Sequence, residues 1–184
     1  MTADAVAPPP LVLTIGHSTR SFEELLALLQ RNAVTRLADV RTIPKSRRHP
    51  HFAIDALQQT LPAAGVAYEH MAGLGGLRRP APDSINMAWR NTSFRGYADY
   101  MQTPKFVESL EALIARAEHE QVAIMCAEAV HWRCHRSLIS DALIVRGLRV
   151  EHILSETSRR VHELTPFARV EGTQVTYPGQ PTLL

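Results

Sequence analysis

Short apolar runs alternate with helical stripes along most of this chain, and this alternation is the feature that most restricts its fold. The clearest run, Val122-Ala123-Ile124-Met125, is uninterrupted by polar residues, which is typical of a parallel strand covered on both faces. A helical stripe in residues 104–117 precedes it, and another in residues 134–147 follows it. Strands and helices that alternate at this spacing predict βα units and a mostly parallel sheet, that is, an α/β fold.

The pattern predicts five main strands with helices between them. The first helix has the clearest start, because Ser21 and Glu24 form a capping-box pattern ahead of a leucine stripe. Gly147 marks the end of the last helix. The expected strands are residues 11–15, 35–40, 66–70, 121–126 and 149–154, with a short edge strand at 174–177. The expected helices are residues 22–29, 52–61, 94–101, 104–117 and 134–147.

Composition and length indicate one domain. Residues 1–10, which end in three prolines, predict a disordered tail, and residues 11–184 a single α/β domain. With 45% hydrophobic and 21% charged residues, the chain can bury a sizeable core. It shows neither a secretory signal nor an apolar run of membrane-spanning length, and its two cysteines make no disulfide framework. We therefore expect a cytoplasmic protein with reduced thiols and no membrane partner.

Polar and reactive side chains follow the first four predicted strands. In an open parallel sheet, ligands bind outside the carboxyl ends of the strands, so these side chains should share one rim. The residues concerned are His17, Ser18, Asp39, Arg41, His70, Cys126 and Glu128. Their convergence predicts a functional site at this rim.

Cys134-His135-Arg136 opens the last predicted helix and is the sharpest candidate for chemistry. Free N–H groups and the helix dipole favour a thiolate there, and neighbouring basic residues would lower its pKa further. The alternative is a thiol packed beneath the helix, because buried cysteines are often inert. Polar neighbours on both sides favour a functional Cys134. Cys126 ends a buried strand, and we expect it to act as a small core residue.

Two other chemistries fit this stretch less well. Cys126, Cys134, His131 and His135 offer ligands suited to zinc, but their spacing matches no standard zinc signature. A phosphatase-type loop would place arginine six residues after the cysteine, where this chain has Trp132. Zinc-dependent hydrolysis is kept as an alternative, which metal analysis would test.

Several short motifs occur along the chain in a distinctive order. They are Thr14-Ile15-Gly16-His17-Ser18, Leu37-Ala38-Asp39-Val40-Arg41, Leu74-Gly75-Gly76, Gly96-Tyr97-Ala98, Cys126-Ala127-Glu128 and Cys134-His135-Arg136-Ser137. Together they resemble the family called domain of unknown function 488, over about residues 11–153. The resemblance implies a three-layer, Rossmann-like α/β domain with a mostly parallel sheet. It implies no particular activity.

These observations favour an enzyme, a hydrolase or a group transferase, that binds an anionic phosphate- or nucleotide-like substrate. Cys134 would be its nucleophile, and the proton-transfer candidates are His17, His70, Asp39 and Glu128. Because arginine suits phosphate and carboxylate groups, it dominates the residues expected to hold the substrate, which are Ser18, Arg41, Arg47, His135 and Arg136. Asp39 has an alternative role in a structural salt bridge with Arg41 or Arg136.

A different class of function is a non-catalytic module whose basic rim binds nucleic acid or a partner. Such binding would depend on salt and on Arg47 and Arg48 rather than on Cys134. The net charge of +2 is too small to indicate nucleic acid by itself, and no named nucleic-acid-binding module matches. No pattern in the sequence fixes the oligomeric state.

Overall fold

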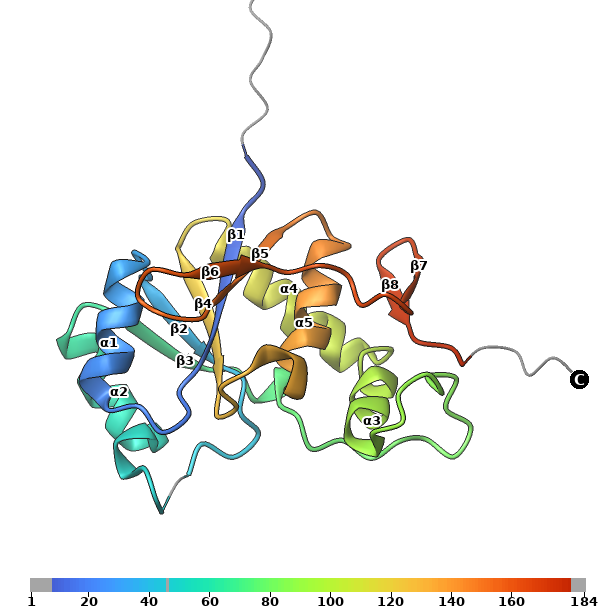
Figure 1. Ribbon diagram of the computed structural model, residues 1–184, viewed down its shortest axis with the longest axis horizontal. Helices are drawn as coiled ribbons and strands as arrows, with labels where there is room; N and C mark the ends of the chain where they lie inside the picture. The colour runs from blue at the N-terminus through green and yellow to red at the C-terminus, as the bar shows by residue number, and fades with distance from the viewer. Residues whose placement is uncertain (1–7, 46, 180–184) are drawn as a thin grey trace, which may run out of the picture.

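A six-stranded sheet forms the centre of the computed structural model, which describes residues 8–45 and 47–179 (Figure 1). The strand order is β3-β2-β4-β1-β5-β6, and every neighbouring pair is parallel except the antiparallel pair of β5 and β6. Most of the tail expected at residues 1–10 lies outside the described residues. Pro8, Pro9 and Pro10 have no regular secondary structure.

The strands and helices alternate along the chain as predicted. The sheet consists of β1 (Leu11–Gly16), β2 (Arg36–Asp39), β3 (Ala67–His70), β4 (Val122–Cys126), β5 (Arg149–Ile153) and β6 (Arg159–Val161). A separate hairpin consists of β7 (Arg169–Glu171) and β8 (Gln174–Thr176). The helices are α1 (Phe22–Arg31), α2 (Ile54–Ala63), α3 (Thr92–Tyr100), α4 (Pro104–Ala117) and α5 (Arg136–Ile144).

Helices cover both faces of the sheet and create two hydrophobic cores. Leucines of α1 and α2 pack with Leu13 and Ile15 on one face. Side chains of α3, α4 and α5 pack with Val12 and Ile124 on the other. Because successive strand residues point to opposite faces, β1 and β4 each contribute to both cores. The predicted three-layer α/β architecture is confirmed.

Several boundaries differ from the predicted ones. Helix α5 begins at Arg136 rather than at Cys134, because the backbone of Cys134 is extended, with φ −134° and ψ 146°. Helix α2 continues through Pro62, and the expected edge strand pairs only within the β7–β8 hairpin. Strand β6 was not expected. Its pairing with β5 brings the region after residue 155 back beside the sheet.

The connections of β1 and β4 create a switch point between these two adjacent strands. Strand β1 connects to β2 through α1 on one face, whereas β4 connects to β5 through α5 on the opposite face. Ligands of open α/β sheets bind where connections diverge in this way. Gly16 and Cys126 are paired at this end of the two strands. None of the helices in the described part of the chain has the length and apolar character needed to span a membrane.

Candidate functional site

The loop after β4 brings the two cysteines together. It crosses the end of β1 so closely that a Cβ on Gly16 would lie 1.8 Å from the carbonyl oxygen of Glu128, and only glycine fits there. The backbone N–H of His17 donates to the carbonyl of Cys126 at 3.0 Å, which fixes the start of the loop. A short helical turn, His131–Arg133, then returns the chain to Cys134. The Sγ atoms of Cys126 and Cys134 are 2.7 Å apart.

Arg136 lies against both thiols and completes what we call the thiol cluster, Cys126, Cys134 and Arg136. Its side chain is 1% exposed, and its Nε donates to the Sγ of Cys126 at 3.0 Å. The backbone N–H of Arg136 donates to the Sγ of Cys134 at 3.4 Å. Nη1 and Nη2 donate to Thr14 Oγ1 and to the carbonyl of Glu128. Among the described residues no carboxylate contacts this guanidinium, so the sulfur atoms are the ionisable groups nearest to its charge.

This arrangement separates the pKa values of the two thiols. Burial alone would raise the pKa of Cys134. The hydrogen bond with Cys126, the charge of Arg136 and the backbone N–H outweigh burial and lower this pKa from 9.0 to about 7. Burial and the hydrogen bond with Cys134 raise the pKa of Cys126. The two shifts have opposite directions, so Cys134 is the more acidic thiol of the pair.

His135 supplies a base beside this thiol. Its Nε2 lies 2.9 Å from the carbonyl oxygen of Val40, which can only accept, so Nε2 carries the proton. Nδ1 is then an acceptor, 3.6 Å from the Sγ of Cys134. Burial lowers the pKa of His135 and favours this neutral form. A thiol, an imidazole nitrogen that can accept its proton and an orienting carbonyl thus lie in sequence, which is the arrangement that an activated nucleophile requires.

The thiol cluster opens into a cleft of about 440 Å³, which we call the thiol cleft. Three segments surround it: the chain after β2, the chain before and within α3, and the loop between β4 and α5. The polar and reactive residues of the lining are Arg41, Thr42, Asn91, Ser93, Cys126, Glu128, Arg133, Cys134 and His135. The larger apolar and aromatic residues are Ile43, Leu77, Phe94 and Tyr97. The lining suits a small molecule that has both a polar group and an apolar part.

Asp39, Arg41 and His17 form a second buried cluster next to the thiol cleft. Arg41 donates to both oxygens of Asp39, at 2.8 and 2.5 Å, and to the carbonyl of Phe52 at 2.8 Å. Its Nη1 lies 3.3 Å from His17 Nε2, and Tyr68 donates to Asp39 at 2.7 Å. The expected alternative, a structural salt bridge between Asp39 and Arg41, is therefore present. These bonds use four of the five N–H groups of Arg41, and Arg41 alone of the three lines the cleft.

The remaining predicted residues lie around this centre. Glu128 lines the thiol cleft and is exposed, whereas Ser18 binds the loop after β4 through its backbone N–H. The imidazole of His70 contacts the carbonyl of Arg41 at 2.8 Å, outside the cleft lining. Arg47 is exposed in the loop after β2 and also lies outside that lining.

The four candidate zinc ligands are not gathered at one point. Cys126, Cys134 and His135 lie in the thiol cleft, but the ring of His131 stacks on His152, with centroids 3.5 Å apart. Within residues 8–45 and 47–179, no group of three or more His, Cys, Asp or Glu side chains is arranged to hold a metal ion. The donors present therefore do not fit a zinc centre.

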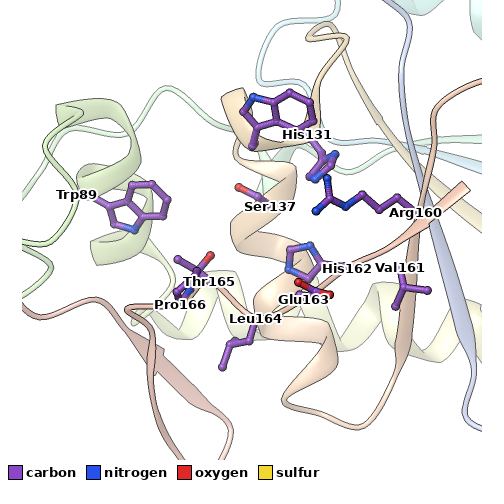
Figure 2. Close-up of a pocket in the computed structure, with 11 residues that line it drawn as sticks. Trp89, His131, Ser137, Arg160, Val161, His162, Glu163, Leu164, Thr165 and Pro166 are labelled. Atoms are coloured by element: carbon purple, nitrogen blue, oxygen red, sulfur yellow. The ribbon is translucent and has the colours of Figure 1, made fainter.

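A histidine cluster that the sequence did not reveal lies between α5 and the sheet. It consists of His131, His152, His162 and Asp141, and it borders a second pocket of about 470 Å³. Figure 2 shows His131, Arg160 and His162 across this pocket from Trp89. His152 Nε2 lies 3.0 Å from His162 Nδ1, and His162 Nε2 lies 2.8 Å from Asp141. Tyr177 also donates to Asp141, at 2.7 Å.

The available signal for this cluster was a polar residue within each of two predicted elements. Asp141 interrupts the apolar stripe of α5, and His152 lies between Glu151 and Ile153 in the short strand β5. Each is fully or almost fully buried, and a buried polar side chain requires a partner. The sequence does not show that these partners come from segments as distant as β1, β6 and the chain before β7.

A family model provides the comparison with known proteins. No curated protein and no solved structure was found to match the chain. Residues 21–143 match the model described as Domain of unknown function DUF488, a range that contains the whole thiol cluster but neither His152 nor His162. This range lies inside the span of the motifs that resemble the family. Because it covers more than half of the 184 residues, the chain belongs to the DUF488 family.

Proposed function

We propose that the protein is an enzyme that binds an anionic small molecule in the thiol cleft and attacks it with the Sγ of Cys134. The observation that carries this proposal is the buried Arg136, whose guanidinium faces sulfur instead of a carboxylate. A buried cation without a direct counter-ion is costly, and a thiolate beside it reduces that cost. The charge of Arg136 and its backbone N–H, which donates to the Sγ of Cys134, lower the pKa of that thiol and so favour its nucleophilic form.

The reaction class that fits these groups is nucleophilic group transfer, with hydrolysis when water is the acceptor. His135 Nδ1 would take the proton of the Cys134 thiol and later return it to the leaving group. The covalent intermediate would form on Cys134 and would be released by water or by a second substrate. This assigns His135 to proton transfer rather than to substrate binding alone.

Charge and shape of the cleft support an anionic substrate with an apolar part. Arg133 is exposed within the lining, and Arg41 has one N–H group that the Asp39 cluster does not use. Glu128 is the acidic residue of the lining. Phe94 and Tyr97 provide an aromatic surface on the α3 side. A substrate with a phosphate or carboxylate group on an apolar or ring-shaped body matches this lining.

Alkylation by matched reagents tests the thiolate and the charge together. We expect iodoacetamide to label Cys134 with a midpoint near pH 7, and we expect the anionic iodoacetate to react faster, relative to iodoacetamide, than it does with a free thiol. Cys134→Ser should abolish labelling. Arg133→Gln should reduce the preference for iodoacetate, whereas Arg48→Gln, an exposed arginine outside the lining, should not.

Turnover is tested with a panel of small phosphate esters, carboxylic esters and thioesters. The expected result is a covalent adduct on Cys134, seen by intact-protein mass spectrometry, that Cys134→Ser prevents. Binding and turnover that are unchanged in Cys134→Ser would overturn the proposal. Salt-dependent binding of an oligonucleotide that survives Cys134→Ser, together with absence of any adduct, would instead identify a non-catalytic binding module.

A further inference from the structure

We propose that Cys126 and Cys134 form a redox-active dithiol that reduces low-molecular-weight disulfides and is itself converted to an intramolecular disulfide. This second activity rests on the proposed function in one respect, because it uses the same reactive Cys134. It does not require the anionic substrate proposed for the thiol cleft. The contact between the two Sγ atoms, at 2.7 Å, carries the inference. Each cysteine is 3% exposed, and each lines the thiol cleft.

Secondary structure holds the two thiols in place. Cys126 is the last residue of β4, paired with Gly16, and Cys134 directly precedes the first turn of α5. A disulfide requires Cβ vectors that face each other across a short distance, and sulfur atoms in contact satisfy this requirement without a large backbone movement. The loop of residues 127–133 closes the pair, so a disulfide would cross-link a strand end to the helix that follows it.

The two cysteines are unequal in the way that a two-step exchange requires. Cys134 holds the negative charge, because Arg136 and the hydrogen bond from Cys126 stabilise its thiolate. Cys126 has the raised pKa, so it is the cysteine that keeps its proton. Attack by thiolate is followed by attack of the second thiol on the mixed disulfide, so Cys134 is the attacking cysteine and Cys126 the resolving one.

The chemistry balances with a disulfide such as oxidised glutathione as the oxidant. The Cys134 thiolate attacks one sulfur of glutathione disulfide, forms a mixed disulfide and releases one glutathione thiolate. Cys126 loses its proton to that thiolate or to His135 Nδ1 and attacks the Sγ of Cys134. The second glutathione then leaves as a thiolate, which takes up a proton. In total the dithiol gives up two protons and two electrons, and one glutathione disulfide becomes two glutathione thiols.

Arg136 influences the balance between the two redox states. In the reduced state a thiolate on Cys134 would stabilise the charge of Arg136, and oxidation to a disulfide would remove that negative charge. Stabilisation of the reduced form makes the disulfide easier to reduce. Two molecules of glutathione should therefore reopen the protein disulfide and leave as glutathione disulfide, so the protein can repeatedly reduce a low-molecular-weight disulfide other than glutathione disulfide.

Separate substitution of the two cysteines tests the order of attack. After exposure of reduced protein to oxidised glutathione at neutral pH, we expect the wild type to lose two hydrogens, to retain no glutathione and to resist alkylation. Cys126→Ser should retain one glutathione on Cys134, because the resolving thiol is absent. Cys134→Ser should react at least about tenfold more slowly than Cys126→Ser, because its remaining thiol is protonated and buried. Cys126→Ala is the second variant, in case the serine hydroxyl alters the packing.

Three outcomes would overturn the inference: a wild type that retains glutathione, a wild type that stays fully alkylatable, or Cys126→Ser and Cys126→Ala proteins that acquire no glutathione. If the wild-type Cys134 still reacts with iodoacetate near neutral pH in any of these cases, the dithiol activity fails and the nucleophile of the proposed function stands. If Cys134 forms the disulfide but forms no adduct with any ester of the panel, the proposed function fails and the dithiol activity stands.

Discussion

The thiol cluster and the histidine cluster lie near each other along α5, and each contains a buried side chain that is charged, Arg136 in one and Asp141 in the other. In the thiol cluster the cation Arg136 faces two titratable sulfur atoms. In the histidine cluster the carboxylate of Asp141 accepts hydrogen bonds from His162, Tyr177 and the backbone N–H of Thr165. Thr14 joins the two, since its Oγ1 contacts Arg136 at 3.1 Å and His152 at 2.7 Å.

This connection fixes the protons of the histidine cluster. Arg136 can only donate, so the hydroxyl of Thr14 accepts from it and gives its own proton to His152 Nδ1. His152 then donates from Nε2 to His162, and His162 donates from Nε2 to Asp141. Each proton in this series of hydrogen bonds, from Thr14 to Asp141, therefore has one position. The thiol cluster, by contrast, contains a proton that leaves near neutral pH. We therefore propose a structural role for the histidine cluster and a reactive role for the thiol cluster.

Acid should destabilise the protein mainly through its buried histidines, and this is the largest effect expected. Burial, first of all, lowers the pKa of His152 to about 2 and those of His131 and His17 to about 4. These values lie below 6.5, so the unfolded chain binds more protons in acid and stability is lost as pH falls through 6.5 toward 4. Between pH 6.5 and 4.5 we expect a loss on the order of 4 kcal/mol, to which the half-exposed His131 contributes less because solvent screens it.

Urea unfolding at a series of pH values measures this loss. His131→Phe should make the acid slope shallower by less than one proton, because His152 and His17 still titrate. It should preserve the stack on His152 and remove Nδ1, which has no hydrogen-bond partner in the described structure. Cys134→Ser should leave the acid slope unchanged. A stability that does not vary between pH 6.5 and 4.5 would contradict the assignment of neutral, buried histidines.

Removal of the carboxylate charge at the end of the hydrogen-bonded chain should cost about 3 kcal/mol. In Asp141→Asn, an amide N–H₂ would face either the Nε2–H of His162 or the hydroxyl of Tyr177, both of which donate to Asp141. The free energy of unfolding in urea at neutral pH measures the cost. Asp83→Asn, at an exposed turn, is the matched control and should change stability by less than about 0.5 kcal/mol. An Asp141→Asn protein as stable as the wild type would show that the hydrogen bonds to Asp141 do not stabilise the fold.

The sequence pointed to the residues of the thiol cluster but did not reveal the histidine cluster, and the range of the interactions explains the difference. Cys134, His135 and Arg136 are neighbours in the chain at a helix start, so their local chemistry was visible. Thr14 and His152 are 138 residues apart and meet only through the pairing of β1 and β5. Strand β6, which positions His162, is three residues long and fully exposed, so its burial pattern carried no signal.

The contact between the two cysteines could be predicted only in part from the sequence. Cys126 was expected to be a packed strand end, and it is buried as expected. The loop of residues 127–133 contains a helical turn that no periodicity in the sequence indicates, and this turn sets the distance to Cys134. The helices and strands followed from local periodicity, whereas the geometry of the site depended on the path of one loop.

The thiol cluster should make stability rise with pH in a window where the histidine cluster has no effect. The pKa of Cys134 is lowered from 9.0 to about 7, so between these values the folded protein has released a proton that the unfolded chain still holds. Stability therefore rises from pH 7 to pH 9, by about 2 kcal/mol, and is lost as pH falls through 7. Urea unfolding under reducing conditions should show the rise in the wild type and in His131→Phe but not in Cys134→Ser. A wild-type free energy of unfolding that does not vary between pH 7 and pH 9 would contradict the Cys134 thiolate, on which both proposals depend.

The smallest expected effect tests whether the position of the His135 base matters to the reactive cluster alone. A Cβ at Gly76 would lie 3.0 Å from His135 Nδ1 and 3.3 Å from its Cε1, so Gly76→Ala must displace the ring by a few tenths of an ångström. The ring is held by the carbonyl of Val40 at 2.9 Å and yields little, so we expect a loss of about 1 kcal/mol in stability.

We also expect slower alkylation of Cys134 in Gly76→Ala below pH 7, where proton removal by His135 contributes, and an unchanged rate well above it. The acid slope due to the buried histidines should be the same as in the wild type, because Gly76 does not border the histidine pocket. Slower alkylation at every pH would mean that the new methyl group only blocks the cleft, and His135 would then lose its role as the base.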